Sequence, residues 1–372
     1  MSPHISPSEN TVGSFVYDAL PGRVVFGSGA STGRLAAEVE RLGCERVLVV
    51  AAEPERELAR RLVAPLGDRV AATFEEVRAH VPVEVAQRAR AAARDARADG
   101  LLCIGGGSTT GTAKAIALEQ PLPIVAVPTT YAGSEMTPVW GLTEGRRKTT
   151  GRDAAVQPAV VVYDPELTLT LPPEISGPSA MNAMAHCVEA FYAPGANPIT
   201  SLMAEEGIRA LARGVPVAVE RPGDLDGRAD TLYGAYLAGA AFAVAGSGLH
   251  HKICHALGGA FDLPHAQTHT IVLPHVVAYN APAMPAIAER LDRVLGERGD
   301  PAAALYDLAA GIGAPMALAD VGLPAGGIDE VLEPILAVVP PSNPRPVDAD
   351  GLRAVLAGAA AGVRPSAAIL NR

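Results

Sequence analysis

The sequence predicts an α/β domain followed by an all-helical domain, and three observations lead to this fold class. The first half alternates short apolar runs with helical patterns, which is typical of a parallel sheet covered on both faces. Beyond Pro165 such runs nearly vanish, and alanine-rich helical patterns take over. The 372 residues are 49% hydrophobic, enough for more than one domain. We expect an α/β domain over residues 1–166 and an all-helical domain over residues 167–372.

Six short apolar runs are the expected strands of the sheet. Each is bounded by polar or glycine-containing segments, as strands usually are. These runs are Val24–Phe26, Val47–Ala52, Val70–Phe74, Leu101–Ile104, Ile124–Val127 and Val160–Tyr163. Helices are expected between them at Ser31–Leu42, Glu55–Val63 and Glu84–Arg97. Ser31 is the expected cap of the first helix, which ends at Gly43.

The second half is expected to consist of helices. Their patterns cover Ser179–Phe191, Ile199–Leu211, Thr231–Ala245, Pro301–Ala310 and Leu352–Ala361. One uncharged run, Leu232–Leu249, is long enough to raise the question of a membrane span. It is rich in alanine and glycine and lacks flanking cationic anchors, which favours a tightly packed core helix. No membrane association is therefore expected.

Charge and cysteine content bear on the class of function. Thirty basic and 40 acidic residues give a net charge of −10, without a block of like charges. Nucleic-acid binding needs a clustered basic face, so no nucleic-acid partner is expected. The four cysteines form no Cys-x-x-Cys pair. With no secretory signal at Met1–Glu9, the reduced cytoplasm is the expected location.

The strongest local motif is a glycine-rich turn between a buried strand and a helix. Gly105-Gly106-Gly107-Ser108 follows Leu101–Ile104 and precedes a helical segment that reaches Lys114. Glycines allow backbone N–H groups to approach a pyrophosphate, and the helix N-terminus adds partial positive charge. The order of strand, glycines and helix predicts the phosphate site of a dinucleotide. A tight turn that binds nothing is the alternative.

Three further segments follow expected strands and are weaker candidates for a cofactor site. Glu53 can accept a hydrogen bond from a ribose hydroxyl and would repel a 2′-phosphate, which favours NADH over NADPH; surface charge is the alternative. Thr129, Thr130 and Ser134 suit a polar ligand at the edge of the sheet, or they cap their own loop. The Gly27-Ser28-Gly29 turn is as consistent with a simple turn as with a cofactor contact.

The histidines gather in the helical half. His251 and His255 are separated by one helical turn, which places them on one face. His250 adjoins them, His265 follows shortly after, and His186 lies on the first helix expected in this half. A single histidine is most simply a satisfied core residue, but each of several buried imidazoles needs a polar partner. Together they predict a functional cluster.

These motifs resemble the iron-dependent alcohol dehydrogenase superfamily over nearly the whole chain. The resemblance implies the dehydroquinate synthase-like fold, in which a dinucleotide-binding domain precedes a helical domain and substrate binds between them. It also implies NAD(H) or NADP(H) as cofactor and a homodimer. In that superfamily a metal is held by an aspartate, a histidine one turn later and two further histidines. The matching positions are Asn182, His186, His251 and His265, and His255 matches a histidine near the nicotinamide.

The finer pattern resembles the maleylacetate reductases. The segments that carry it are Tyr131–Pro138, Arg147–Asp153, Met181–His186 and Gly248–Lys252. Gly111 also fits, where the wider family usually has aspartate. Asn182 replaces the aspartate ligand, and an amide is a weaker, neutral ligand for a divalent ion. The resemblance therefore implies a branch that can dispense with the metal, and we expect the metal site to be unused.

The resemblance implies that hydride from NAD(P)H reduces the conjugated C=C bond of maleylacetate to give 3-oxoadipate through an enolate. Hydrogen-bond donors can stabilise an enolate without a Lewis acid. The expected catalytic residues are His251 and His255, with His250, His186 and Lys252 in support. The substrate is a dianion, and the candidates to bind its carboxylates are Lys252, Arg147, Lys148 and Arg152. A solvated loop is the alternative for the basic run.

Three other functions are consistent with the same residues. One is a metal-dependent alcohol or polyol dehydrogenase that accepts Asn182 as a ligand. Another is a lyase or cyclase of a biosynthetic pathway that retains NAD, as the related dehydroquinate synthases do. The third is a binding protein without activity, against which the intact glycine loop and the histidine set argue.

Overall fold

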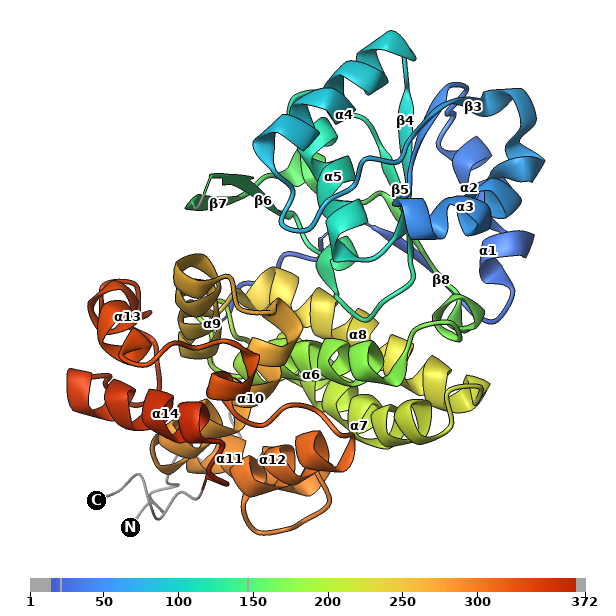
Figure 1. Ribbon diagram of the computed structural model, residues 1–372. Helices are drawn as coiled ribbons and strands as arrows, with labels where there is room; N and C mark the ends of the chain where they lie inside the picture. Colours follow the sequence, from blue (N-terminus) through green and yellow to red (C-terminus); the bar gives the residue numbers. More distant parts are fainter. Residues whose placement is uncertain (1–14, 21, 146, 366–372) are drawn as a thin grey trace, which may run out of the picture.

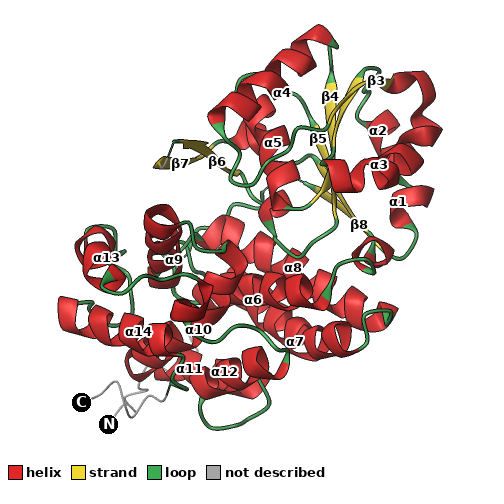
Figure 2. Ribbon diagram, viewed as in Figure 1, coloured by secondary structure: helices red, strands yellow, loops and turns green. Residues whose placement is uncertain are grey.

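The computed structural model describes residues 15–20, 22–145 and 147–365, and the side chains of Arg147 and Lys148 lie outside this description. One half of the molecule is a sheet covered by helices, and the other half is built of helices (Figures 1 and 2). The alternation of patterns in the sequence predicted this fold class, and the structure confirms it. Met1–Glu9, where no secretory signal is expected, is outside the described residues.

Six parallel strands form the sheet in the order β1-β8-β5-β4-β2-β3. They are β1 (Arg23–Phe26), β2 (Val47–Val50), β3 (Val70–Phe74), β4 (Gly100–Gly105), β5 (Ile124–Pro128) and β8 (Val160–Tyr163). Every strand expected from the sequence is therefore present. The largest difference between expected and observed bounds is at the end of β2, which stops at Val50 rather than at Ala52.

Alternate residues of the strands face two different cores. Leu48 and Leu101 pack in the core that includes α4 and α5, whereas Val49 and Leu102 pack in the core that includes α2 and α3. Successive side chains of a strand point to opposite faces, so a sheet covered on both faces needs continuous apolar runs. The covering helices are α2 (Leu35–Arg41), α3 (Arg56–Val63), α4 (Val83–Asp95) and α5 (Gly107–Ala117).

One expected helix is divided, and the prediction that Ser31 caps it is wrong. The segment forms α1 (Ala30–Gly33) and α2, separated by Arg34, and the residue that caps α1 is Gly29. The Ser31 hydroxyl instead donates to the Asp164 carboxylate at 2.6 Å. The same carboxylate also accepts hydrogen bonds from the N–H groups of Gly29 and Ser31. These amides are used within the protein, which favours a simple turn at Gly27-Ser28-Gly29 over a cofactor contact.

Long helices pack around α6 in the second half (Figure 1). All five expected helices overlap observed ones, and α9, α10, α11 and α13 are additional. The helices are α6 (Pro173–Glu189), α7 (Pro198–Glu220), α8 (Leu225–Ala245), α9 (Leu249–Phe261), α10 (His265–Asn280), α11 (Pro285–Val294), α12 (Pro301–Gly311), α13 (Gly327–Leu336) and α14 (Ala349–Ala361). Gly234 allows close packing of α8 on α7, because a Cβ there would lie 2.6 Å from Leu211 Cγ.

The uncharged run expected to form a core helix spans the end of α8 and the start of α9. Within the described ranges, no single helix is long and apolar enough to cross a membrane. Helices α8 and α9 meet the length and composition of a span only as a pair, and they are bent by 97° at the break between them.

A two-stranded antiparallel hairpin, β6 (Val139–Glu144) and β7 (Arg147–Arg152), was not expected from the sequence. It projects sideways from the α/β half and lies above α9 in the view of Figure 1. Trp140 packs over Gly151, where a Cβ would lie 2.5 Å from Trp140 Cζ2. The basic run that the sequence left open as a solvated loop is thus a strand.

Candidate active site

The glycine-rich loop lies where the direction of the sheet's strand order reverses. β2 and β4 are neighbours, with Val50 opposite Cys103, so Glu53 and Gly105 leave adjacent strands at the same edge. The helices that follow these two strands, α3 and α5, cover opposite faces of the sheet. Open α/β sheets bind ligands in the crevice that forms at such a point.

At two of the three glycines a side chain would press on a neighbouring threonine. Gly105 has φ +151°, and a Cβ there would lie 2.4 Å from Thr109 Oγ1. A Cβ on Gly106 would lie 3.0 Å from the Thr130 methyl group on the neighbouring loop. Helix α5 begins at Gly107 without a side-chain cap, so the N–H groups of its first turn, which includes Ser108, are available to an anion. The loop fits a pyrophosphate.

Replacing Gly106 with valine is expected to weaken binding of the reduced cofactor at least about tenfold, or about 1.4 kcal/mol. The added side chain would press on Thr130 and cover the N–H groups of the turn. Fluorescence titration of NADH and NADPH measures the effect, and circular dichroism controls for folding. Unchanged affinity in a folded variant would remove the loop from the cofactor site.

Two buried cations fix the loop that follows β5. Lys114 Nζ donates to the carbonyl oxygens of Ser134 at 2.6 Å and Thr137 at 2.7 Å, and burial lowers the pKa of Lys114 to about 7. Arg228, on α8, donates to the Tyr131 hydroxyl at 3.1 Å. The loop that carries the cofactor candidate Ser134 is therefore held from both halves of the molecule. No sequence pattern predicts this role, because a lysine near the end of a helix usually lies at the surface.

Helices α6, α9 and α10 bring the expected histidines together and add His269. The rings of His186 and His251 stack with centroids 5.0 Å apart, and the His269 ring lies 4.7 Å from His251. His250 Nε2 and His269 Nδ1 share a hydrogen bond of 3.0 Å. His265 in turn lies 4.3 Å from His269 by ring centroid. The imidazoles thus form one continuous cluster.

Glu189 orients His251 and was missed by the sequence analysis. Its fully buried carboxylate accepts from His251 Nδ1 at 2.5 Å and from the N–H groups of Gly248 at 2.8 Å and His250 at 2.7 Å. Burial raises the pKa of Glu189 to about 7, and hydrogen bonds from the backbone amides of Gly248, His250 and His251 oppose this rise. No local pattern marks Glu189, because its partners lie 59 to 62 residues further along the chain.

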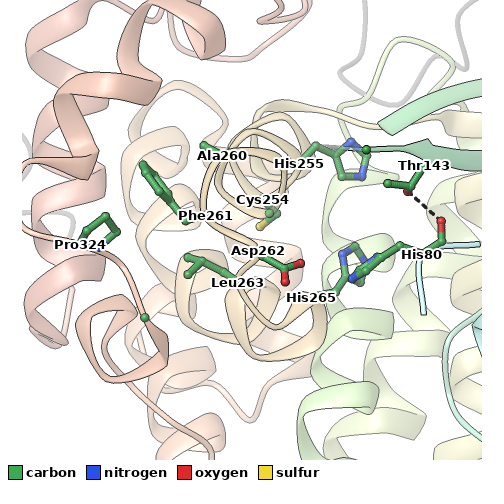
Figure 3. Close-up of a pocket in the computed structure, with 14 residues that line it drawn as sticks. His80, Thr143, Cys254, His255, Ala260, Phe261, Asp262, Leu263, His265 and Pro324 are labelled. Carbon is green, nitrogen blue, oxygen red and sulfur yellow. Dashed lines mark hydrogen bonds between the residues drawn. The ribbon is translucent and has the colours of Figure 1, made fainter. Parts of the chain in front are cut away.

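A pocket of about 590 Å³ opens between the two halves (Figure 3). Some histidines of the cluster line this pocket, and the others are buried. His255 and His265 are exposed and line it. His250 and His251 are buried behind the wall, at 0% and 2% exposure, and Lys252 is half-buried and is not a lining residue. Of the expected catalytic residues, His255 is therefore the one with direct access to the pocket.

The residues at the family's metal positions do not fit a divalent ion. Asn182, His186, His251 and His265 offer a neutral amide and three imidazoles. Among the described residues, the group whose ligand atoms all lie within 4.8 Å of one another is instead His250, His251 and His269. In that trio His250 and His269 are already hydrogen-bonded to each other. Neither set includes a carboxylate as a direct ligand, and the nearby Glu189 carboxylate is hydrogen-bonded to His251 Nδ1.

Of the basic residues expected to bind the substrate carboxylates, Arg152 is hydrogen-bonded within the protein. The Arg152 guanidinium donates to the Ala243 carbonyl oxygen at 2.5 Å, which ties the hairpin to α8. The Arg147 and Lys148 side chains are outside the described part, so their role stays a prediction.

The free energy of unfolding is expected to fall as the pH drops from about 6.5 toward about 4. Burial lowers the pKa of His186 and His275 to about 4 and that of His250 to about 3, and it also lowers the pKa values of His251 and His269. The unfolded chain therefore binds more protons than the folded one in this range, which destabilises the fold. Burial raises the pKa values of Glu189, Glu135 and Glu55, which acts in the opposite direction, but these are three carboxyl groups against five histidines. Urea unfolding at several pH values measures the trend; a constant free energy between pH 7 and pH 5 would contradict it.

Comparison with known proteins places this architecture in a family. Residues 21–165 match the iron-containing alcohol dehydrogenase family, and residues 178–360 match the C-terminal part of the Fe-containing alcohol dehydrogenase family. A maleylacetate reductase of Sphingobium indicum is 53% identical over 94% of this chain and 99% of its own. The crystal structure of maleylacetate reductase from Agrobacterium tumefaciens has a TM-score of 0.90 at 45% identity, covering 95% of this chain and 100% of its own.

A second crystal structure, of maleylacetate reductase from a Rhizobium species, also has a TM-score of 0.90, at 46% identity over 95% of this chain and 99% of its own. The resemblance found in the sequence is confirmed by these matches. The chain belongs to the iron-containing alcohol dehydrogenase family, in the branch that contains these maleylacetate reductases.

Proposed function

We propose that the protein reduces the conjugated C=C bond of maleylacetate to give 3-oxoadipate, with NAD(P)H as the reductant. The observation that carries this proposal is the 53% identity to a maleylacetate reductase over nearly the full length of both chains. The site is consistent with it: both halves contribute to the pocket that His255 lines, and the loop after β5 reaches the histidine cluster, since a Cβ on Gly133 would lie 3.4 Å from His186 Nδ1. We place the boundary between the halves near residue 166, between β8 and α6.

The cofactor residues we propose are the Gly105–Gly107 turn, Ser108, Thr129, Thr130, Ser134 and Glu53. When bound, the nicotinamide supplies the hydride. Glu53 is exposed at the edge of the sheet, where a carboxylate disfavours a 2′-phosphate, so we propose NADH as the preferred form. The homodimer implied by the family resemblance stays a prediction.

The protein's own contribution is to orient the substrate and stabilise its enolate. Addition of a hydride to the carbon β to the ketone breaks the C=C π bond and moves an electron pair toward the ketone oxygen. His255, at the pocket wall, is placed to donate a hydrogen bond to this oxygen or a proton to the carbon next to it. The ring contacts with His251, which Glu189 orients, hold His255 from behind. One proton taken up at the α-carbon completes the product.

The direct test is NADH oxidation measured with maleylacetate and, separately, with simple aldehydes. Stoichiometric oxidation with maleylacetate and formation of 3-oxoadipate support the proposal. Oxidation with aldehydes alone would favour the alcohol dehydrogenase alternative. Catalysis without net NADH consumption would favour the lyase or cyclase alternative, and the absence of any turnover would favour the binding protein.

Exhaustive chelation is expected to leave the activity of the purified enzyme within about twofold of the untreated enzyme. The expectation rests on Asn182, a neutral amide at the family's aspartate position, and on the His250–His269 hydrogen bond, which an ion held by His250, His251 and His269 would have to replace. Metal analysis of the chelated sample accompanies the rate measurement. If chelation abolishes activity and iron or zinc alone restores it, the metal-free mechanism is wrong.

A further inference from the structure

The α/β half contributes an imidazole of its own to the pocket, that of His80. His80, Thr143 and Gly145 line the pocket from this half, opposite His255 and His265 of the helical half. The side chains of His80, Thr143, His255 and His265 gather at one end of the pocket (Figure 3). Those of Phe261, Leu263 and Pro324 lie at the other end. The pocket therefore has a hydrogen-bonding end to which both halves contribute, and an apolar end.

The charge of the lining residues limits how this pocket can bind an anion. Within the part of the chain that the structure describes, no lysine or arginine lines it, and Asp262 is the charged lining residue. Among the described groups, imidazole N–H groups and backbone amides are the donors that can meet the carboxylates of a dianion. His80 is the described lining side chain of the α/β half that offers such a donor, because the Thr143 hydroxyl donates to the His80 carbonyl oxygen.

The backbone that presents His80 is strained and firmly held. His80 has φ +61° and Val81 has φ +48°, a left-handed conformation that is rare for any residue with a side chain and rarer for a β-branched one. Thr143 fixes both residues: its hydroxyl donates to the His80 carbonyl oxygen at 2.8 Å, and its N–H donates to the Val81 carbonyl oxygen at 3.1 Å. Such strain persists only where neighbouring contacts determine the conformation.

Gly111 makes this conformation possible. The Val81 side chain is buried against Ala86 of α4, Ala115 of α5 and Leu142 of β6. A Cβ on Gly111 would lie 2.8 Å from Val81 Cγ2, closer than packed carbon atoms can approach. Gly111 is also the position at which the sequence departs from the aspartate usual in the wider family. The departure and the placement of His80 are thus linked by direct packing.

We infer that His80 is a specificity-determining residue that donates a hydrogen bond to one carboxylate of a dicarboxylate substrate, and that the packing of Val81 on Gly111 holds it in place. This inference rests on the proposed function, because it requires an anionic substrate in the pocket. It gives the α/β half a role in substrate selection in addition to cofactor binding.

The test compares His80→Ala with His80→Asn, which keeps an N–H donor and tolerates a positive φ. His80→Ala is expected to raise KM for maleylacetate about tenfold to 100-fold, with a smaller effect on kcat, whereas His80→Asn recovers part of the loss. Two monoanionic analogues, each lacking one of the two carboxylates, identify the carboxylate concerned. The KM penalty should vanish for one analogue and persist for the other. Arg78→Ala, in the same exposed loop but outside the pocket lining, is the matched control.

A second set of variants tests the packing. Gly111→Ala should reproduce the rise in KM because it displaces Val81, and Val81→Ala in the same chain should relieve the contact and restore KM toward the wild-type value. Equal KM penalties for maleylacetate and both analogues, or no penalty in His80→Ala, would overturn the inference. If the wild-type enzyme does not reduce maleylacetate, the proposed function fails by itself. Calorimetric binding of adipate to the wild type and to His80→Ala then decides: weaker binding to the variant supports the role of His80, and equal binding rejects it.

Discussion

Replacing His255 with alanine is expected to lower kcat by about 10²–10⁴-fold while cofactor affinity stays nearly unchanged. His255 is the exposed member of the i, i+4 pair on α9, and it lines the pocket that we propose for the substrate. The loss should fall on kcat because enolate stabilisation or protonation acts in the transition state. Steady-state kinetics with maleylacetate, together with NADH titration, measure the two quantities.

Two further variants make the His255 result interpretable. His255→Gln keeps an N–H donor, so partial recovery of kcat would indicate hydrogen bonding to the enolate, whereas no recovery would indicate proton transfer. His251→Ala is expected to lose stability as well as kcat, because His251 is buried against Glu189. A loss confined to KM in His255→Ala would contradict the catalytic role and leave His255 as a residue that only binds substrate.

Replacing Glu189 with alanine is expected to lower the free energy of unfolding by about 3–5 kcal/mol. The substitution leaves three buried donors without an acceptor: the N–H groups of Gly248 and His250, and His251 Nδ1. It also removes the group that orients His251, so kcat should fall in molecules that remain folded. Urea denaturation with matched activity measurements tests both effects.

Glu174→Ala is the matched control, since Glu174 is an exposed carboxylate on the same helix. Its effect on the free energy of unfolding should stay within about 0.5 kcal/mol. If the two substitutions lower the free energy of unfolding by the same amount, Glu189 does not organise the start of α9 and does not orient His251.

The sheet was predictable from sequence because its four central strands, β2, β4, β5 and β8, are buried on both faces. Val47–Val50 and Leu101–Ile104 are continuous apolar runs, and no competing pattern explains them. The β6–β7 hairpin was not predictable from sequence, because its stability comes from cross-strand contacts such as Trp140 on Gly151. These contacts are not visible in the local pattern of either strand.

The candidate site likewise contains residues that the sequence predicts and residues that it does not. The glycine loop carries its own signal, because strand, glycines and helix follow one another in the chain. Glu189 and His80 carry none: the first acts on a helix 59 residues away, and the second reaches the pocket through a left-handed turn held by Thr143 and Gly111. Only the folded chain brings such residues to the histidines.

The most direct test of the central claim follows the hydride itself. NADH carrying deuterium at the transferred position is supplied with maleylacetate, and the product is examined by nuclear magnetic resonance and mass spectrometry. Reduction of the conjugated C=C bond predicts one deuterium on the carbon β to the ketone of 3-oxoadipate, at a position that does not exchange with water. Deuterium on a carbinol carbon would mean that the enzyme reduces a carbonyl group, and would contradict the account.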